Sequence, residues 1–336
     1  MTIIAAGSIA TDHLMVFPGR FVEQLVEGEL HQISLSFLVD DLQVRRGGIG
    51  ANVSFGLGIL GLRPVLVGAV GTDFAEYGAW LEDHGVDTSH VHVSSTHHTA
   101  RFVCTTDADQ NQIATFYAGA MSEAREIDLG EVIAALDDVD VVVISPDDPA
   151  AMLRHTRYCR ENGVRFAADP SQQLARMDGA DISELVEGAS YLFTNAYEAD
   201  LLRQKAGWSV EDVLDRVGMW ITTSGADGVT ITSRHRDQLH VDAVLATGVA
   251  DPTGVGDAFR AGFLAGLTRG LDLERSTQLG AGLATLVVET VGTQQYTFEP
   301  STFFTRLGDV YGTTASAEIE SALFSAPATT TARGES

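Results

Sequence analysis

Short hydrophobic runs alternate with segments of helical period along most of the chain. Runs rich in β-branched residues, such as TIIAAG at 2–7 and VDVVVIS at 139–145, precede amphipathic segments such as PAAMLRHTRYCRENG at 149–163. This alternation predicts an α/β fold, with a mostly parallel central sheet flanked by helices. Ligands bind such sheets at the carboxyl ends of the strands, so the polar residues just after each run are the candidates for chemistry.

Two stretches, residues 31–46 and 89–118, instead alternate with period two and are rich in Val, Thr and aromatic residues. This pattern is typical of half-exposed antiparallel strands. We interpret them as one small β-sheet, inserted twice into the core and placed to close over a site as a lid. The predicted division, completed by a polar and disordered tail, is an α/β core of residues 1–12, 47–85 and 119–325, a β lid of residues 13–46 and 86–118, and the tail 326–336.

The charge of the chain excludes several classes of function. The formal net charge is −25, and Lys205 is the only lysine among the 21 basic residues. Nucleic acid and anionic membranes need a basic footprint, so neither is an expected partner. The P-loop and the protein-kinase motifs each need a lysine in a context that Lys205 lacks. If the chain handles phosphate, backbone amides, arginines and a metal ion must hold it.

The remaining composition predicts a cytoplasmic protein. No apolar run reaches the roughly 18 residues that a membrane helix needs, and the first residues do not resemble a signal peptide. Cys104 and Cys159 lack the spacing of a metal site or a disulfide framework, which fits a reducing compartment.

The stretch DPTGVGDAFRAGFLAGL at 251–267 places a glycine-rich loop before a helix. Free N–H groups at a helix N-terminus favour a bound anion, yet the loop ends in an acid, Asp257. Either Asp257 only caps the helix, or its carboxylate acts on the group to which a phosphate is transferred.

Other polar positions follow predicted strands or turns, and each has a purely structural alternative as a cap or a turn. Asn195 and Glu198 would hold Mg²⁺ through water beside a phosphate, although an Asn and a Glu three apart also form an ordinary capping box. Three further groups can likewise be either ligand contacts or ordinary caps and turns. The first contains an acid that could accept hydrogen bonds from a vicinal diol, the second contains paired amides that could meet a base edge, and the third consists of three glycine turns. The positions concerned are Ser8, Asp12, Gly47, Gly48, Gly50, Asn52, Asp169, Gln172, Gln173, Arg176, Thr223, Gly225 and Gly228.

The order of three motifs is more specific than any one of them. RGGIGANVSFGLGILG near residue 50, N-x-x-E at 195–198 and DPTGVGDAFRAGF near residue 257 together resemble the ribokinase family of sugar and nucleoside kinases. Shorter matches, including GSIATDHLM, SLSFLVDDL and DPSQQLARM, are similar to the actinobacterial type of adenosine kinase within that family. The resemblance covers the chain to about residue 325.

The resemblance implies a role for each position. Asp257 would be the general base for the 5′-hydroxyl of adenosine, with the amides of Gly254, Val255 and Gly256 as the anion hole for the γ-phosphoryl group of ATP. Glu198 would organise Mg²⁺, Asp251 lies near a possible K⁺ site, and a homodimer is expected because lid strands are exposed edges. The expected nucleoside contacts are Ser8, Asp12, Ser36, Gly48, Asn52, Phe102, Phe116, Met121, Gln172, Gln173 and Arg176, and the expected ATP contacts are Asn195, Thr223, Gly225 and Gly228.

Two alternatives stay open at this point. One is a sugar kinase of the same family, for ribose, fructose or a similar acceptor, and the other is a nucleoside-binding protein without turnover. Gln172, Gln173 and the paired aromatics Phe102 and Phe116 favour a flat heterocycle over a bare sugar. Asp227 stands where many relatives carry a lysine, which leaves the phosphate donor open.

Overall fold

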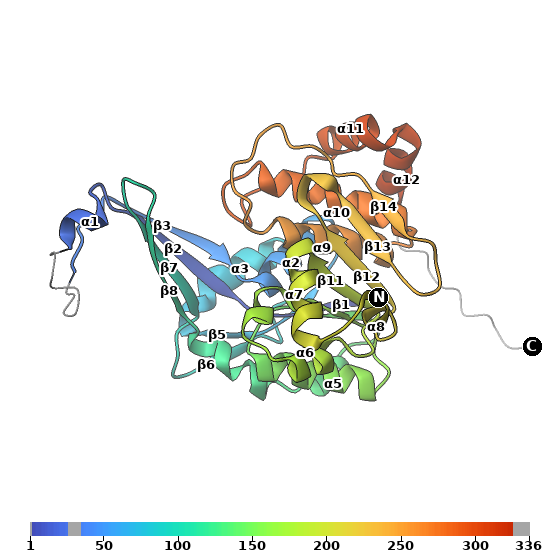
Figure 1. Cartoon of the computed structure of the whole chain (residues 1–336), viewed down its shortest axis with the longest axis horizontal. Helices are drawn as coiled ribbons and strands as arrows, with labels where there is room; N and C mark the ends of the chain where they lie inside the picture. The colour runs from blue at the N-terminus through green and yellow to red at the C-terminus, as the bar shows by residue number, and fades with distance from the viewer. Residues whose placement is uncertain (1, 26–34, 325–336) are drawn as a thin grey trace, which may run out of the picture.

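Eight strands form one central sheet in the computed structural model, which describes residues 2–25 and 35–324 (Figure 1). The neighbouring strands from β4 to β12 are parallel, and the last two are antiparallel. The predicted mostly parallel α/β architecture is therefore confirmed. In order across the sheet, the strands are β14 (Leu239–Val241), β13 (Val229–Thr232), β12 (Met219–Thr223), β11 (Tyr191–Asn195), β10 (Phe166–Ala168), β9 (Val139–Ile144), β1 (Thr2–Ala6) and β4 (Val65–Val67).

Helices cover both faces of this sheet because its strands are apolar on both sides. Side chains alternate between the faces, so Ile3 and Ala5 pack into one hydrophobic core while Ile4 and Ala6 pack into the other. Within residues 2–25 and 35–324, no helix has both the length and the apolar character needed to cross a membrane. The first core includes α2 (Ile49–Ile59), α3 (Ala75–Asp83), α9 (Val255–Thr268), α10 (Leu273–Val288), α11 (Pro300–Tyr311) and α12 (Thr313–Phe324), and the second includes α4 (Leu129–Ala134), α5 (Pro149–Glu161), α6 (Gly179–Val186), α7 (Ala196–Ala206) and α8 (Val210–Leu214).

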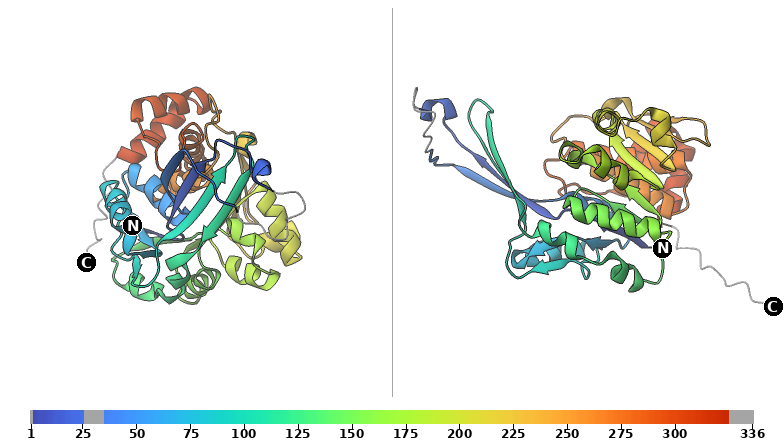
Figure 2. Two further views of the ribbon diagram at one scale, coloured as in Figure 1. Left: turned by 90° about the vertical axis from the view of Figure 1, so that its left-hand side faces the viewer. Right: turned by 60° about the horizontal axis from the view of Figure 1, so that its bottom comes forward.

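A second sheet of four strands projects away from the core and carries the short helix α1 (Phe21–Gln24) near its tip (Figures 1 and 2). In order, its strands are β3 (Asp41–Gly47), β2 (Ala10–Val16), β7 (Ala100–Thr106) and β8 (Gln112–Tyr117). In this lid sheet, β2 lies between β3, which comes largely from the first stretch of period two, and the pair β7 and β8, which comes from the second.

The lid differs from the expectation in two details. Strand β2 starts at Ala10, inside the segment assigned to the core, and β6 (His92–Ser94) pairs with the core strand β5 (Ala69–Gly71) instead of joining the lid. A period of two identifies a strand but not its partner, which explains the second difference. Residues 31–34 of the first stretch and the tail 326–336 lie outside the described residues.

The helix that follows the glycine-rich loop, α9, is fixed by close contact with α10. A Cβ atom added to Gly262 would lie 2.7 Å from the Cα atom of Gly280, and one added to Gly280 would lie 2.7 Å from the carbonyl oxygen of Phe259. The two backbones therefore touch, and close packing of this kind leaves α9 little room to move. The loop at its N-terminus faces the carboxyl ends of the parallel strands.

Candidate active site

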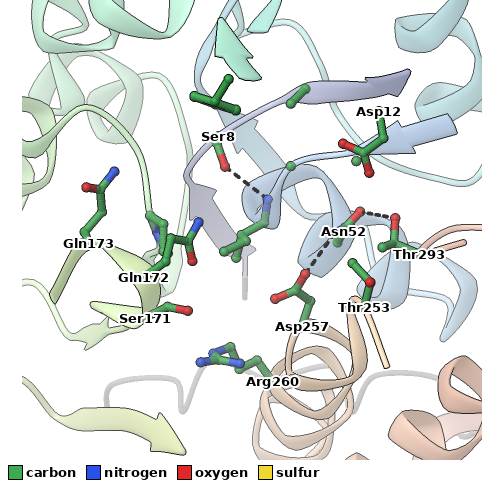
Figure 3. A pocket seen from close by; sticks show the side chains of 18 of the residues that line it. Ser8, Asp12, Asn52, Ser171, Gln172, Gln173, Thr253, Asp257, Arg260 and Thr293 are labelled. Atoms are coloured by element: carbon green, nitrogen blue, oxygen red, sulfur yellow. Dashed lines mark hydrogen bonds between the residues drawn. The ribbon is translucent and has the colours of Figure 1, made fainter. Parts of the chain in front are cut away.

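A cavity of about 570 Å³ lies between the carboxyl ends of the parallel strands, the base of the lid and the N-terminus of α9 (Figure 3). It brings together most of the predicted site residues, although these are scattered along the sequence. The predicted residues that line it are Ser8, Asp12, Gly48, Asn52, Phe116, Met121, Gln172, Gln173, Arg176, Asn195, Glu198, Thr223, Gly254, Gly256 and Asp257.

The loop before α9 presents free backbone amides to this cavity. Gly254 is the N-cap residue, with a φ of 80° in the left-handed region, and no side chain caps the helix. A Cβ atom at Gly254 would also lie 2.8 Å from the Thr293 side chain, so only glycine fits. The N–H groups of the first turn have no partner within the helix and carry its positive dipole. They form a potential anion site.

Asp257 is buried in the first turn of α9 and faces the cavity with one carboxylate oxygen. Its Oδ2 accepts a hydrogen bond of 2.8 Å from Asn52 Nδ2, while Oδ1 has no hydrogen-bond partner in the described part of the chain (Figure 3). Burial raises the pKa of Asp257, and both Arg260 and the Asn52 hydrogen bond oppose this rise. The arrangement leaves Oδ1 free to accept a proton.

Asn52 is itself held by a chain of buried hydrogen bonds. Its Oδ1 accepts from Thr293 Oγ1 and from Gln294 Nε2, both at 2.9 Å, which fixes the amide so that Nδ2 faces Asp257. Gln294 Nε2 also donates to the hydroxyl of Tyr77 at 2.6 Å, and Tyr77 donates to the carbonyl of Gly47 at the end of β3. The orientation of the Asp257 carboxylate thus depends on residues that the sequence reasoning did not single out.

Arg260 is a further residue that the sequence reasoning did not single out. It lines the cavity one turn after Asp257, and its Nη2 donates a hydrogen bond of 2.6 Å to Asp169 Oδ1. Both side chains are buried. The two residues are 91 positions apart in the sequence, so no local pattern could have paired them.

Asp12 stands on β2, opposite Arg45 of β3, and points into the cavity (Figure 3). It has no side-chain hydrogen bond within the described residues, so both of its oxygens are available to a ligand. Burial raises the pKa of Asp12 to about 6, against the opposing effect of Arg45. Beside it, Gly48 begins α2 with a φ of 94°, and a Cβ atom there would lie 2.5 Å from the carbonyl oxygen of Ser8. The Ser8 hydroxyl accepts from the backbone N–H of Ile49.

The turn after β10 brings Gln172 and Gln173 to the opposite wall. Gln173 Nε2 donates to the carbonyl of Asp147 at 2.7 Å, and its Oε1 has no partner within the described residues. The Nζ group of Lys205 anchors this turn, because it donates to three backbone carbonyls at 2.6 to 3.0 Å. These acceptors belong to Leu174, Ala175 and Met177.

Asn195 and Glu198 form the capping box of α7 and also line the cavity. Asn195 Oδ1 accepts from the backbone N–H of Glu198 at 2.8 Å, and Glu198 Oε2 accepts from the backbone N–H of Asn195 at 2.7 Å. The second Glu198 oxygen accepts from the Ser171 hydroxyl at 3.3 Å. The two readings of this motif are compatible, since the cap holds Glu198 in position at the cavity wall.

A smaller cavity of about 260 Å³ adjoins the first one at Thr223 and Gly256, which line both. Its walls are largely apolar and come from β12, the turn η4 (Gly225–Asp227), α9 and α10. The predicted residues Gly225, Gly228 and Val255 lie here rather than in the larger cavity. The N-terminus of α9 therefore stands at the junction of a polar and an apolar compartment.

Three of the residues to which the resemblance assigns a role lie outside both cavities. Ser36 is exposed before β3, and Phe102 pairs in register with Phe116 on the lid, where only Phe116 reaches the cavity. The lid sheet points away from the core in this structure, which keeps most of its residues at a distance (Figure 2). Asp251 accepts from the backbone N–H groups of Thr253 and Gly292. The proposed roles of these three residues stay predictions.

Comparison with known proteins agrees with this geometry. The sequence model of the pfkB family of carbohydrate kinases matches residues 8–299. The nucleoside kinase of Methanothermobacter thermautotrophicus is 32% identical over 79% of this chain and 85% of its own length, and that of Methanocaldococcus jannaschii is 31% identical over 74% and 80%.

Solved structures of a bacterial kinase resemble this chain in the same way. The ligand-free nucleoside kinase of Burkholderia thailandensis is 35% identical, with a TM-score of 0.82 over 91% of this chain and 100% of that one. The same kinase in complex with ADP-inosine gives a TM-score of 0.78 at 35% identity, over 93% of this chain and 96% of that one. Because the family model spans most of the chain and these relatives exceed 30% identity over most of their lengths, the chain belongs to the pfkB family of carbohydrate kinases, which is the ribokinase family.

Proposed function

We propose that this protein is an ATP-dependent nucleoside kinase that transfers the γ-phosphoryl group of ATP to the 5′-hydroxyl of adenosine. The observation that carries the proposal is the position of Asp257, a buried carboxylate beside the free amides of α9, at the junction of the two cavities. The names of the relatives support a nucleoside as acceptor, and the complex of the Burkholderia kinase with ADP-inosine supports an adenine nucleotide on the donor side.

In this proposal the two parts of the α9 N-terminus act on opposite sides of the reaction. Asp257 Oδ1 accepts the proton of the 5′-hydroxyl as the hydroxyl oxygen attacks the γ-phosphorus of ATP and ADP leaves, while Asn52 holds Oδ2. The amides of Gly254, Val255 and Gly256 stabilise the negative charge on the transferred phosphoryl group. The acid and the anion site therefore do not compete, because they face different reactants.

The acceptor side of the cavity suits a ribose and a flat base. Asp12 has two free carboxylate oxygens, which can accept hydrogen bonds from the 2′- and 3′-hydroxyls. Ser8, Gly48 and Asn52 lie beside it, and Gln172, Phe116 and Met121 belong to the part of the wall assigned to the base.

Gln173 favours adenine over hypoxanthine. Its Nε2 is used by the carbonyl of Asp147, and its buried Oε1 has no partner within the described residues, so in this proposal Oε1 is the atom that meets the base. An acceptor pairs with the exocyclic amino group of adenine, whereas hypoxanthine presents a carbonyl oxygen at the same position and would leave both acceptors unpaired.

The apolar cavity suits the base of the donor nucleotide, with Thr223, Gly225 and Gly228 along its edge. In the larger cavity, the proposed ligand for Mg²⁺ is Glu198. Among the described residues no three His, Cys, Asp or Glu side chains gather as a metal site, but Glu198 has a carboxylate at the wall beside Asn195. Mg²⁺ is commonly bound by one or two carboxylates together with substrate phosphates and water, and it would offset phosphate charge there.

The test is a panel of adenosine, inosine, ribose and fructose, each incubated with ATP and Mg²⁺ and analysed for phosphorylated product by mass spectrometry. We expect AMP from adenosine at the highest kcat/KM, with inosine at least about tenfold lower because of the unpaired acceptor. Product from the sugars alone would assign the chain to the sugar kinases of the family. Tight nucleoside binding without any product would refute the kinase assignment.

A further inference from the structure

We propose that Arg260 is a further catalytic residue, whose guanidinium contacts the phosphoryl group during transfer and stabilises the charge that develops on it. This inference rests on the proposed kinase function and adds to it a residue of the third motif to which the resemblance assigned no role.

The position of Arg260 on α9 directs its side chain toward the first turn of that helix. It lies four residues after Gly256 and three after Asp257, and helical side chains lean toward the N-terminus, so the guanidinium lies over the first turn. A Cβ atom added to Gly256 would lie 2.6 Å from Arg260 Nη1. Gly256 lines both cavities, so Nη1 stands where a phosphate chain must cross from one to the other.

The hydrogen bonds of Arg260 leave part of its donor set unused. Nη2 donates to Asp169, but Nη1 has no partner within the described residues, and Nε is buried without one. A guanidinium that served only to pair with Asp169 would not need a place at the cavity wall (Figure 3). We infer that Asp169 orients the group and that Nη1 is kept for the ligand.

The charges around the cavity need such a cation. Asp257, Asp169 and Glu198 surround Arg260, and a bound triphosphate adds further negative charge. Among the described residues that line the cavity, only Arg176 and Arg260 are cationic. The single lysine of the chain, Lys205, is occupied by three backbone carbonyls. Arg260 is the one of the two arginines that lies on the helix carrying the anion site.

The first variant is Arg260→Gln, measured with the nucleoside that the panel identifies. We expect kcat to fall at least about 100-fold, since removal of one donor from a charge-stabilising site typically has this effect. The nucleoside Kd, measured by calorimetry, should change by less than about threefold, because the guanidinium is not assigned to the acceptor. Arg260→Lys keeps a charge without the planar fork and should recover part of the lost kcat.

Arg165→Gln is the matched control. Arg165 donates to Asp140 at 3.2 Å and to the Tyr191 hydroxyl at 2.7 Å, and its guanidinium lies 5.7 Å from the centre of the Tyr191 ring. Like Arg260, whose guanidinium lies 5.6 Å from the Phe193 ring, it has an acidic partner and an aromatic neighbour. Its side chain is more exposed, however, and it lies just before β10, at the amino ends of the parallel strands. This variant should keep kcat within about twofold.

The outcomes separate the two proposals. If the wild-type protein phosphorylates no nucleoside, the proposed function fails. If the wild type is active and Arg260→Gln keeps kcat within about threefold, or loses activity only in proportion to the unfolded fraction seen by circular dichroism, the role of Arg260 is refuted. If Arg260→Gln does not fold, Arg260→Lys decides in its place. A folded lysine variant with wild-type kcat would show that charge alone is enough and that no phosphoryl contact by the fork is needed.

Discussion

Replacement of Asp12 by asparagine should make the free protein more stable while weakening its binding of the nucleoside. Burial raises the pKa of Asp12 from 3.8 in the unfolded chain to about 6 in the folded one. One pKa unit corresponds to about 1.4 kcal/mol, so ionisation of this carboxylate destabilises the fold by about 3 kcal/mol. Below about pH 3 the group is protonated in both states and there is no penalty. As the pH rises from about 3 to 6 the unfolded chain loses the proton first, and stability falls.

The free energy of unfolding in urea measures this effect. The difference between Asp12→Asn and the wild type should be about 1.5 kcal/mol at pH 5 and about 3 kcal/mol at pH 7.5, with the variant more stable at both. The same variant should bind adenosine at least tenfold more weakly, but 2′,3′-dideoxyadenosine almost unchanged, because only the former presents the diol. A variant that is no more stable than the wild type at pH 7.5, or a difference that does not grow with pH, would refute the reasoning.

Four further predictions concern other parts of the molecule. Asp257→Asn should lose at least about 100-fold in turnover yet still bind adenosine, and near-normal turnover would remove its assignment as the base. Glu198→Gln preserves the capping box of α7, so the free energy of unfolding should change by less than about 0.5 kcal/mol. The Mg²⁺ concentration for half-maximal rate should rise, and an unchanged Mg²⁺ requirement would show that Glu198 does not bind the metal. Lys205→Met leaves three carbonyls without their donor and should weaken adenosine binding through the Gln172–Gln173 turn by at least about threefold, seen by calorimetry. Exposed apolar side chains on the lid, including Leu42 and Phe116, predict a homodimer in sedimentation, and a monomer at micromolar concentration would contradict it.

The sequence predicts the core well, and it predicts which residues gather at the larger cavity, because both rest on local patterns. Asp257, Asn195 and Glu198 each follow a recognisable loop or strand end, and the parallel sheet brings such ends to one edge. The partners of these residues could not be predicted in the same way. The Arg260–Asp169 pair and the Asn52–Thr293 hydrogen bond join residues 91 and 241 positions apart, and neither leaves a periodic signal. The lid was harder still, since alternation identifies its strands without specifying their partners or the direction in which the sheet points.

The hydroxyl of Thr293 links strand β3 to the Asp257 carboxylate through Asn52. It lies within hydrogen-bond distance of two acceptors, the carbonyl of Arg46 on the lid strand β3 at 3.0 Å and Asn52 Oδ1 at 2.9 Å. A hydroxyl has one hydrogen, so it can serve only one of these acceptors fully at a time. A movement of β3 that brings the Arg46 carbonyl closer or takes it away changes how firmly Asn52 is held, and Asn52 in turn holds Asp257. The orientation of the Asp257 carboxylate is thereby coupled to the position of β3, the strand that joins the second sheet to the cavity.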